Sequence, residues 1–194
     1  MAYGTNVYID TNVFISAYSR DEKVQYTLSR KFLNEVIKGE KLQIRYSFFT
    51  SGFTLLELVA NIRRKTGSKD KTRSLAWQLK QSWKNKIAMI GFKTKSVPKF
   101  FEELVETAIE LGITTGDTIH SQLIMDTKMD YLITWNKKDF LKLRKKMKHL
   151  EIMTPPEFLK MVENMEKRER TGKFKELLLD KNDMNYKSKK ETIL

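Results

Sequence analysis

The spacing of hydrophobic and polar residues predicts short strands alternating with helices. Residues 7–9 are a β-prone run, followed by three polar residues at 10–12 and then by an apolar helix start. Apolar residues recur at helical spacing over 21–38, and Gly39 is a typical stop for that helix. Residues 42–48 alternate with period two, which predicts a second strand.

The same alternation continues to residue 153, and a closing helix follows the two prolines at 155–156. We expect further helices at 53–65, 69–86, 98–111, 114–127 and 137–147, strands at 130–134 and 149–153, and at 87–91 either a strand or the tail of a helix. Strands that alternate with helices favour a parallel sheet. The predicted fold class is a three-layer α/β/α sandwich with a central parallel sheet.

The 194 residues are long enough for one domain with an appended segment. We expect the domain to occupy residues 1–160. Residues 161–194 are charged and poor in hydrophobic side chains, which predicts a helical or disordered C-terminal extension.

The composition limits which metal sites and binding partners the protein can have. The chain has no Cys and only 2 His, which excludes disulfide frameworks and thiolate zinc sites and leaves oxygen ligands for any metal. The net charge of +13 lies mostly within residues 1–155 and favours a polyanionic partner, although a merely soluble basic protein would look similar. No secretory signal and no apolar run of membrane-spanning length is evident. We therefore expect a cytoplasmic protein that does not enter a membrane.

Polar residues follow two predicted strands and begin two predicted helices. Asp10 follows the first strand, Asp117 begins the helix at 114–127, and Asn136 and Asp139 follow the strand at 130–134. Each has a simpler explanation as a helix cap or first-turn acid. Glu57 lies on the polar face of its helix and, taken alone, is more typical of a solvated surface acid.

Taken together, these acids favour a metal site. The carboxyl ends of parallel strands lie at one edge of a sheet, which is where ligands bind. Carboxylates gathered there repel one another unless a cation neutralises them, and Mg²⁺ is the natural occupant. Within a basic surface, such a site is suited to phosphodiester hydrolysis.

The order of these motifs resembles that of a PIN domain, and is most similar to the VapC-like group of toxin ribonucleases. The motifs are Ile9-Asp-Thr-Asn-Val-Phe14, Glu57 in an apolar helix, Gly116-Asp-Thr-Ile-His120, Leu132-Ile-Thr-Trp-Asn-Lys-Lys-Asp-Phe140 and Thr154-Pro-Pro-Glu-Phe-Leu159. The resemblance implies a Mg²⁺- or Mn²⁺-dependent ribonuclease that cleaves single-stranded RNA. It also implies a homodimer and a small antitoxin partner.

Carried onto this sequence, the resemblance implies that Asp10, Glu57 and Asp117 are catalytic metal ligands. The family often has an acid at the position of Asn136, so either this amide or Asp139 completes the set. Thr11, Asn12 and Thr134 would support these residues. A basic cluster just beyond the helix of Glu57 offers phosphate contacts, or is only a solvated surface: Arg63, Arg64, Lys65, Lys69, Lys71 and Arg73.

Two side chains near these motifs have both a functional and a structural explanation. His120 shares a helix face with Asp117, but a helix His is more often structural or solvated. Trp135 could stack on a base, whereas Phe140 is better explained by core packing.

Two other functions compete with the nuclease. Asn136 favours a PIN module that binds RNA or a protein without cleaving. A phosphotransferase with an aspartyl nucleophile also fits a strand that ends in Asp10. That class usually has a second acid two residues later, where this sequence has Asn12, so it ranks last.

Overall fold

The structure is a computed structural model that describes residues 4–19, 23–91 and 96–171. The chain divides into two compact units, Met1–Pro156 and Glu157–Leu194. In the second unit, residues 157–171 are helical. The rest of the predicted C-terminal extension lies outside the described residues.

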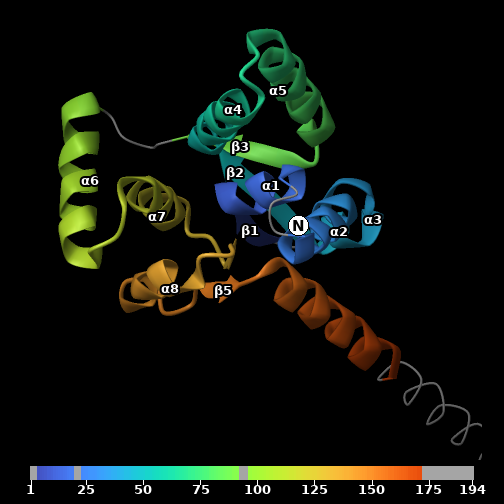
Figure 1. The fold of residues 1–194 in the computed structure, drawn as a ribbon. Helices are drawn as coiled ribbons and strands as arrows, with labels where there is room; N and C mark the ends of the chain where they lie inside the picture. Colours follow the sequence, from blue (N-terminus) through green and yellow to red (C-terminus); the bar gives the residue numbers. More distant parts are fainter. Residues whose placement is uncertain (1–3, 20–22, 92–95, 172–194) are drawn as a thin grey trace, which may run out of the picture. The chain divides into compact units, whose positions relative to one another are not determined.

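A parallel sheet forms the centre of the first unit (Figure 1). Its strands are β1 (Thr5–Ile9), β2 (Tyr46–Ser51), β3 (Ile87–Ile90), β4 (Tyr131–Ile133) and β5 (Glu151–Met153). They lie in the order β3-β2-β1-β4-β5, and every neighbouring pair is parallel. The segment at 87–91, which the sequence left open, is therefore mainly strand.

Helices follow each of the first four strands, and a helical segment follows the fifth. They are α1 (Thr11–Tyr18), α2 (Lys23–Lys38), α3 (Glu40–Arg45), α4 (Gly52–Thr66), α5 (Lys69–Trp83), α6 (Val97–Leu111), α7 (Thr115–Thr127), α8 (Lys137–Phe140) and a 3₁₀ turn at Leu141–Lys145. Gly67 and Gly112 end α4 and α6 in the left-handed region, at φ 63° and 55°. Glycine is favoured there because it has no Cβ.

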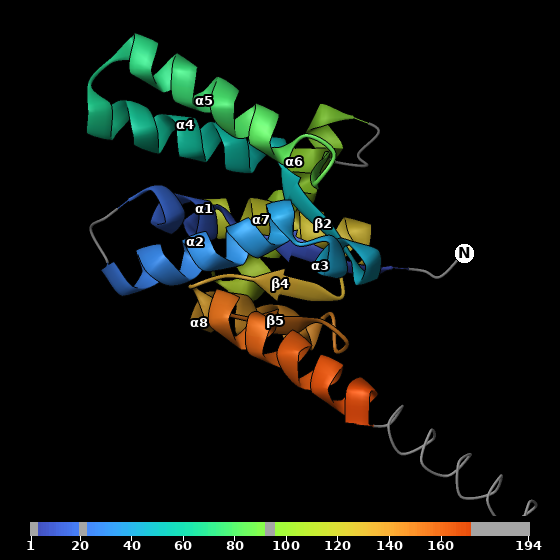
Figure 2. The same ribbon diagram turned by 90° about the vertical axis from the view of Figure 1, so that its right-hand side faces the viewer.

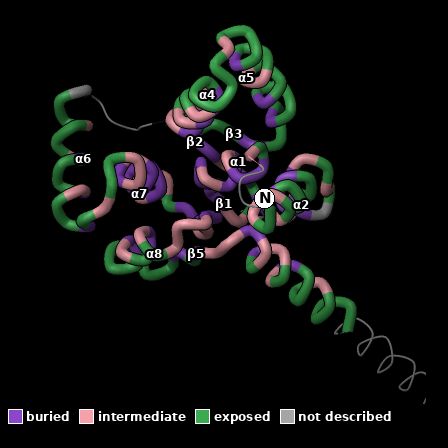
Figure 3. Tube along the Cα trace, viewed as in Figure 1, coloured by how far each residue is buried: buried purple, intermediate pink, exposed green. Residues whose placement is uncertain are grey.

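Side chains on the two faces of the sheet pack against different helices. On one face, Phe32 of α2 contacts Phe48 of β2, and Phe14 of α1 stacks on Trp83 of α5. On the other face, Tyr8 belongs to a core that includes residues of α7, α8 and the 3₁₀ turn. The buried colouring accordingly concentrates on the strands and the inner sides of these helices (Figure 3). The predicted three-layer sandwich is confirmed.

The predicted strand at 42–48 starts too early. Residues 40–45 form the short helix α3, in which Leu42 is 5% exposed and Ile44 is 82% exposed. Two residues separated by one position point in opposite directions on a helix, whereas they share a face on a strand. The spacing of Leu42 and Ile44 therefore resembles that of a strand, although the chain becomes a strand only from Tyr46 onward.

The helix predicted at 137–147 is also broken. Only Lys137–Phe140 is α-helical, and Leu141–Lys145 is a 3₁₀ turn. Phe140 and Leu143 are fully buried, and their spacing of three matches the tighter 3₁₀ winding. The apolar spacing indicated a helical segment but not which kind.

No helix among the described residues is both long and apolar enough to cross a bilayer.

Candidate active site

The ends of β1 and β4 bring Asp10 beside Thr134. The register pairs Ile9 with Ile133, so the residues that follow them leave the sheet together. Thr134 Oγ1 donates a hydrogen bond of 2.7 Å to Asp10 Oδ2, and the Asp10 N–H donates to the Ile133 carbonyl at 3.0 Å. Asp10 therefore lies at the strand-end edge that the sequence predicts for it.

Asp10 is almost wholly buried. Its side chain is also the N-cap of α1, because Oδ1 accepts the Thr11 N–H at 2.7 Å. Burial raises the pKa of Asp10, against the lowering effects of His120 and Thr134, and the negative charge of Asp117 raises it further. Capping and a place in an acid cluster are thus two roles of one side chain.

Glu57 points toward the start of α1 rather than into solvent. Thr11 Oγ1 donates a hydrogen bond of 2.5 Å to Glu57 Oε2, and His120 Nε2 lies 3.1 Å from the same oxygen. Burial raises the pKa of Glu57, but the contacts with His120 and Thr11 outweigh it, so the net shift is downward. Among the described residues, Glu57 makes no ion pair with Arg64, so it is not the solvated acid of the simpler explanation.

His120 joins the acids to the core of the sheet. Its ring is 2% exposed, and Nδ1 lies 2.7 Å from the hydroxyl of the fully buried Tyr8. Nε2 faces Glu57 and Thr11, each at 3.1 Å, and Asp10 Oδ1 at 3.7 Å. Burial lowers the pKa of His120, but Glu57, Asp10 and Asp117 raise it by more. When it is protonated, the imidazole is a counter-cation for the acids around it.

Asp117 lies in the first turn of α7, next to the helix cap. Thr114 caps α7, and its Oγ1 also donates a 2.8 Å bond to Asp117 Oδ2. Burial raises the pKa of Asp117, and the charges of Asp139 and Glu57 add to that rise, against Thr114 and His120. Gly116 leaves room for the Glu57 side chain, because a Cβ at that position would lie 3.0 Å from Glu57 Oε1.

Asn136 bridges two of the predicted acids. Its Nδ2 donates to Asp139 Oδ2 at 2.8 Å and to Asp117 Oδ2 at 3.4 Å. The amide thus presents its N–H groups to the carboxylates, and Asp139 is the residue of this pair that contributes a negative charge.

Thr134 and Asn12 hold this loop in place. Thr134 Oγ1 accepts bonds from Asn12 Nδ2 and from the Asn136 N–H, both at 2.9 Å, while it donates to Asp10. Asn12 Oδ1 accepts the Trp135 N–H at 3.0 Å. The two residues predicted to support the site therefore connect α1 with the loop after β4.

Trp135 and Phe140 are structural in this arrangement. The indole N–H of Trp135 lies 2.8 Å from Ser29 Oγ and 3.1 Å from Ser16 Oγ, which ties the loop to α1 and α2. Phe140 is fully buried in the core, as the sequence indicates.

The four acids form one electrostatic cluster. Asp117 raises the pKa of Asp10, and is itself affected by Asp139 and Glu57. Within the described part of the chain, none of the four pairs with a Lys or Arg. This pattern brings together an acid that follows β1 and acids of α4, α7 and α8, which are far apart in the sequence.

The donor set fits Mg²⁺ or Mn²⁺ in kind, because both ions prefer carboxylate oxygens. Over residues 4–19, 23–91 and 96–171, however, no three Asp, Glu or His side chains are arranged to hold a metal ion. His120 Nε2 and Asn136 Nδ2 instead bridge the acids. The chemistry suits a divalent ion, while the geometry is that of an acid cluster bridged by protein donors.

The predicted RNA-binding residues lie on the outer hairpin formed by α4 and α5 (Figure 2). Arg63–Lys65 occupy the last turn of α4, two turns after Glu57, which is roughly 10 Å along the helix axis. Lys69, Lys71 and Arg73 continue along the start of α5. All six are exposed and lie beside the acid cluster rather than in it.

A family model described as the PIN domain matches residues 7–146, which include every acid of the cluster. The chain belongs to the PIN domain family. Solved structures give weaker likenesses. The chain is similar to VapBC-1 from nontypeable Haemophilus influenzae, with a TM-score of 0.50 and 15% identity over 78% of this chain and 99% of that one. At that identity the likeness supports the PIN fold and nothing more.

Two further structures are similar to this PIN domain at lower scores. VapBC2 from Rickettsia felis, bound to a DNA fragment from its promoter, has a TM-score of 0.48 and 19% identity, covering 76% of this chain and 98% of that one. A protein from Pyrobaculum aerophilum has a TM-score of 0.48 and 14% identity, covering 78% and 92%. No curated protein matches the sequence.

His120 and Tyr8 contribute more to the site than the sequence pattern indicates. The sequence feature that indicates a role for His120 is its spacing of three residues from Asp117, which places both residues on the same helix face. Nothing in the sequence indicates that Tyr8, inside the first strand, turns its hydroxyl toward that ring.

Proposed function

We propose that this PIN domain is a Mg²⁺- or Mn²⁺-dependent endoribonuclease that cleaves single-stranded RNA. The observation that supports it is the gathering of four acids with no Lys or Arg partner among the described residues, at the ligand-binding edge of the sheet. Buried carboxylates that repel one another are costly unless a cation or a proton neutralises them.

Each side chain has a proposed role in this reaction. Asp10, Glu57 and Asp117 would hold the ion, and either Asp139 or the neutral Asn136 would complete the set. A divalent ion bound there would polarise the phosphate and lower the pKa of the attacking water. Thr11, Asn12 and Thr134 hold these side chains in position through their hydrogen bonds to the acids and to the loop after β4.

The basic hairpin would hold the RNA backbone. Six exposed cationic side chains lie along the end of α4 and the start of α5, and the whole chain carries a net charge of +13. Phosphate contacts of this kind provide affinity without sequence preference.

We further propose that the chain works as a homodimer controlled by a small antitoxin. Support comes from the resemblance of the sequence motifs to those of VapC-like toxins. The same reasoning favours a cytoplasmic protein whose catalytic domain covers residues 1–160, with residues 161–194 as its extension.

The test is cleavage of a mixed RNA pool by the purified full chain with Mn²⁺ or with EDTA, followed by mapping of the cut ends. We expect defined cuts with Mn²⁺, none with EDTA, and none from Asp10→Asn or Asp117→Asn. Equal cleavage by the wild type and both variants would show that the activity comes from a contaminant or another site.

Asn136 favours a second candidate, a PIN module that binds RNA without cleaving it. Its amide donates to Asp117 and Asp139, so the fourth position contributes hydrogen-bond donors where an acid would contribute charge. Salt-sensitive RNA binding with the RNA left intact in Mn²⁺ would favour this candidate. Cleavage would exclude it.

A further inference from the structure

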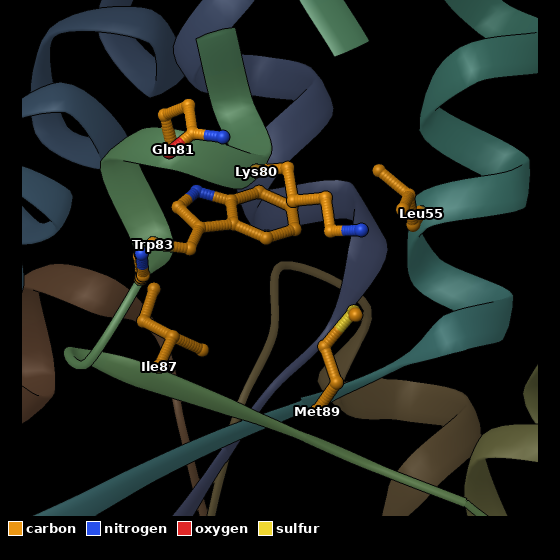
Figure 4. Close-up of a pocket in the computed structure, with 7 residues that line it drawn as sticks. Leu55, Lys80, Gln81, Trp83, Ile87 and Met89 are labelled. Carbon is orange, nitrogen blue, oxygen red and sulfur yellow. The ribbon is translucent and has the colours of Figure 1, made fainter. Parts of the chain in front are cut away.

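A pocket of about 340 Å³ lies between α4, α5 and the edge strand β3 (Figure 4). Leu55, Trp83, Ile87 and Met89 form its apolar wall. Figure 4 shows these side chains projecting into it from three different elements. Lys80 of α5 and its neighbour Lys84 also line the pocket. It is separate from the acid cluster and contains none of its residues.

The pocket has one rigid wall and one open side. Trp83 is 3% exposed and stacks on Phe14, with ring centroids 4.4 Å apart. Met89, in contrast, is 48% exposed on the edge strand. Apolar surface of this kind can accept a flat ring without rearrangement of the core.

The face of α5 that leads to the pocket is basic and carries an exposed tryptophan. Trp77 is 63% exposed, and helical spacing places it on one face with Arg73, Lys80 and Lys84. An aromatic ring among cationic side chains is the combination that binds single-stranded nucleic acid, through base stacking and phosphate contacts.

The pocket and the acid cluster each include a residue of α4. Leu55 precedes Glu57 by two residues on α4, so the two point to opposite sides of the helix. The separation is therefore on the order of a helix diameter, about 10–12 Å. The pocket therefore lies within the length of a few nucleotides of the acids, on the other side of α4.

We propose that this pocket binds one unstacked nucleobase of the RNA, with flanking phosphates on Lys80 and Lys84 and a neighbouring base on Trp77. The inference rests on the proposed function, since it names where that substrate is held. An apolar side chain of a protein partner would fill the cavity but leave the two lysines without anions. A nucleotide uses both features, because it combines a flat ring with a negative charge.

The experiment measures RNA binding in the absence of cleavage. The full chain with Asp117→Asn is titrated with short single-stranded oligoribonucleotides, in which each position in turn lacks its base. We expect one position at which loss of the base weakens binding by about fivefold or more, since stacking of one base contributes roughly 1–3 kcal/mol. In the variant Met89→Trp, which fills the pocket, we expect loss of the base at that position to leave binding unchanged.

A second variant tests the lysines. Lys80→Ala/Lys84→Ala weakens binding of all the oligonucleotides and lowers its salt dependence. Lys31→Ala/Lys38→Ala removes the same charge from exposed positions of α2 and leaves the position-specific effect in place. Leu55→Phe fills the same cavity from α4 and replaces Met89→Trp if that variant does not fold.

Several outcomes would overturn the inference. If the filled variants retain the same sensitivity to the missing base as their parent, the base lies elsewhere, and the proposed ribonuclease still stands. Unchanged RNA affinities in these variants would also fit a protein side chain as the occupant, and would exclude the nucleobase. If the wild type neither binds nor cleaves RNA, the proposed function fails and the nucleobase pocket fails with it.

Discussion

Asp117 is the acid whose charge can be removed with the least structural damage. Its Oδ2 accepts bonds from Thr114 and Asn136, and an amide oxygen can accept both. Asp10 differs, because Thr134 donates to it while accepting two other bonds, so an amide at that position disturbs a full network.

We therefore expect Asp117→Asn to abolish RNA cleavage while the Tm in EDTA stays the same or rises. The pKa of Asp117 is raised by burial and by Asp139 and Glu57, which means that its ionised form destabilises the fold near neutral pH. Calorimetry of the wild type and the variant at pH 7 measures the change. A marked fall in Tm would show that the carboxylate is a structural anchor.

We expect the stability of the metal-free protein to depend on pH through His120. Its folded-state pKa lies above its ordinary value and that of Glu57 lies below its own. Their attraction is therefore fully present once Glu57 is ionised and while the pH is below about 6.5, and it is lost as the pH rises through the folded-state pKa of His120.

Thermal unfolding of the wild type and of His120→Gln in EDTA, across this range, measures that attraction. The wild type should be more stable than the variant by the largest margin near pH 6, and the margin should shrink toward pH 8. A constant difference would mean that the imidazole is neutral throughout and acts only by packing and hydrogen bonding.

At the scale of elements, Gly116 of α7 leaves room for the side chain that Glu57 extends from α4. A methyl group there would lie 3.0 Å from Glu57 Oε1, and alanine has the higher intrinsic helix propensity of the two residues. The two effects act on different quantities, namely the position of Glu57 and the stability of α7.

Gly116→Ala should consequently reduce cleavage severalfold without lowering the Tm. Circular dichroism melts and single-turnover cleavage rates separate the two effects. Gly52→Ala is the matched control, because no atom lies within 4 Å of the Cβ it would add at the start of α4. Equal activity in both variants would show that Glu57 moves aside without consequence.

The elements also show what the sequence could and could not predict. Asp10 and Asp117 follow from local order, because a strand end and a helix cap determine where each side chain lies. The helix α3 does not follow from local order, because a run of a few apolar residues fits both the two-residue period of a strand and the 3.6-residue period of a helix. The contact of Tyr8 with His120 joins residues 112 apart in sequence, and only the folded sheet brings them together.

At the scale of the whole molecule, part of the excess positive charge lies on the α4–α5 hairpin, apart from the acids. The cluster gathers four carboxylates at one edge of the sheet, whereas the α4–α5 hairpin presents exposed arginines and lysines. A polyanion would bind to the hairpin first and would be repelled by the cluster until a cation is bound. Binding and cleavage are therefore separable by charge.

Arg63→Ala/Arg64→Ala should weaken RNA binding about equally for all sequences and reduce the slope of log affinity against log salt by up to about 0.7 for each phosphate that is no longer neutralised. Lys31→Ala/Lys38→Ala carries the same change in net charge on α2 and should alter the slope less. Filter binding at several salt concentrations, in EDTA to prevent cleavage, gives both slopes.

If the slope falls by the same amount in the two variants, affinity depends on net charge alone and the hairpin has no special role in holding RNA. A reduction confined to the hairpin variant would instead place the RNA backbone along α4 and α5, beside the acids that are proposed to cut it.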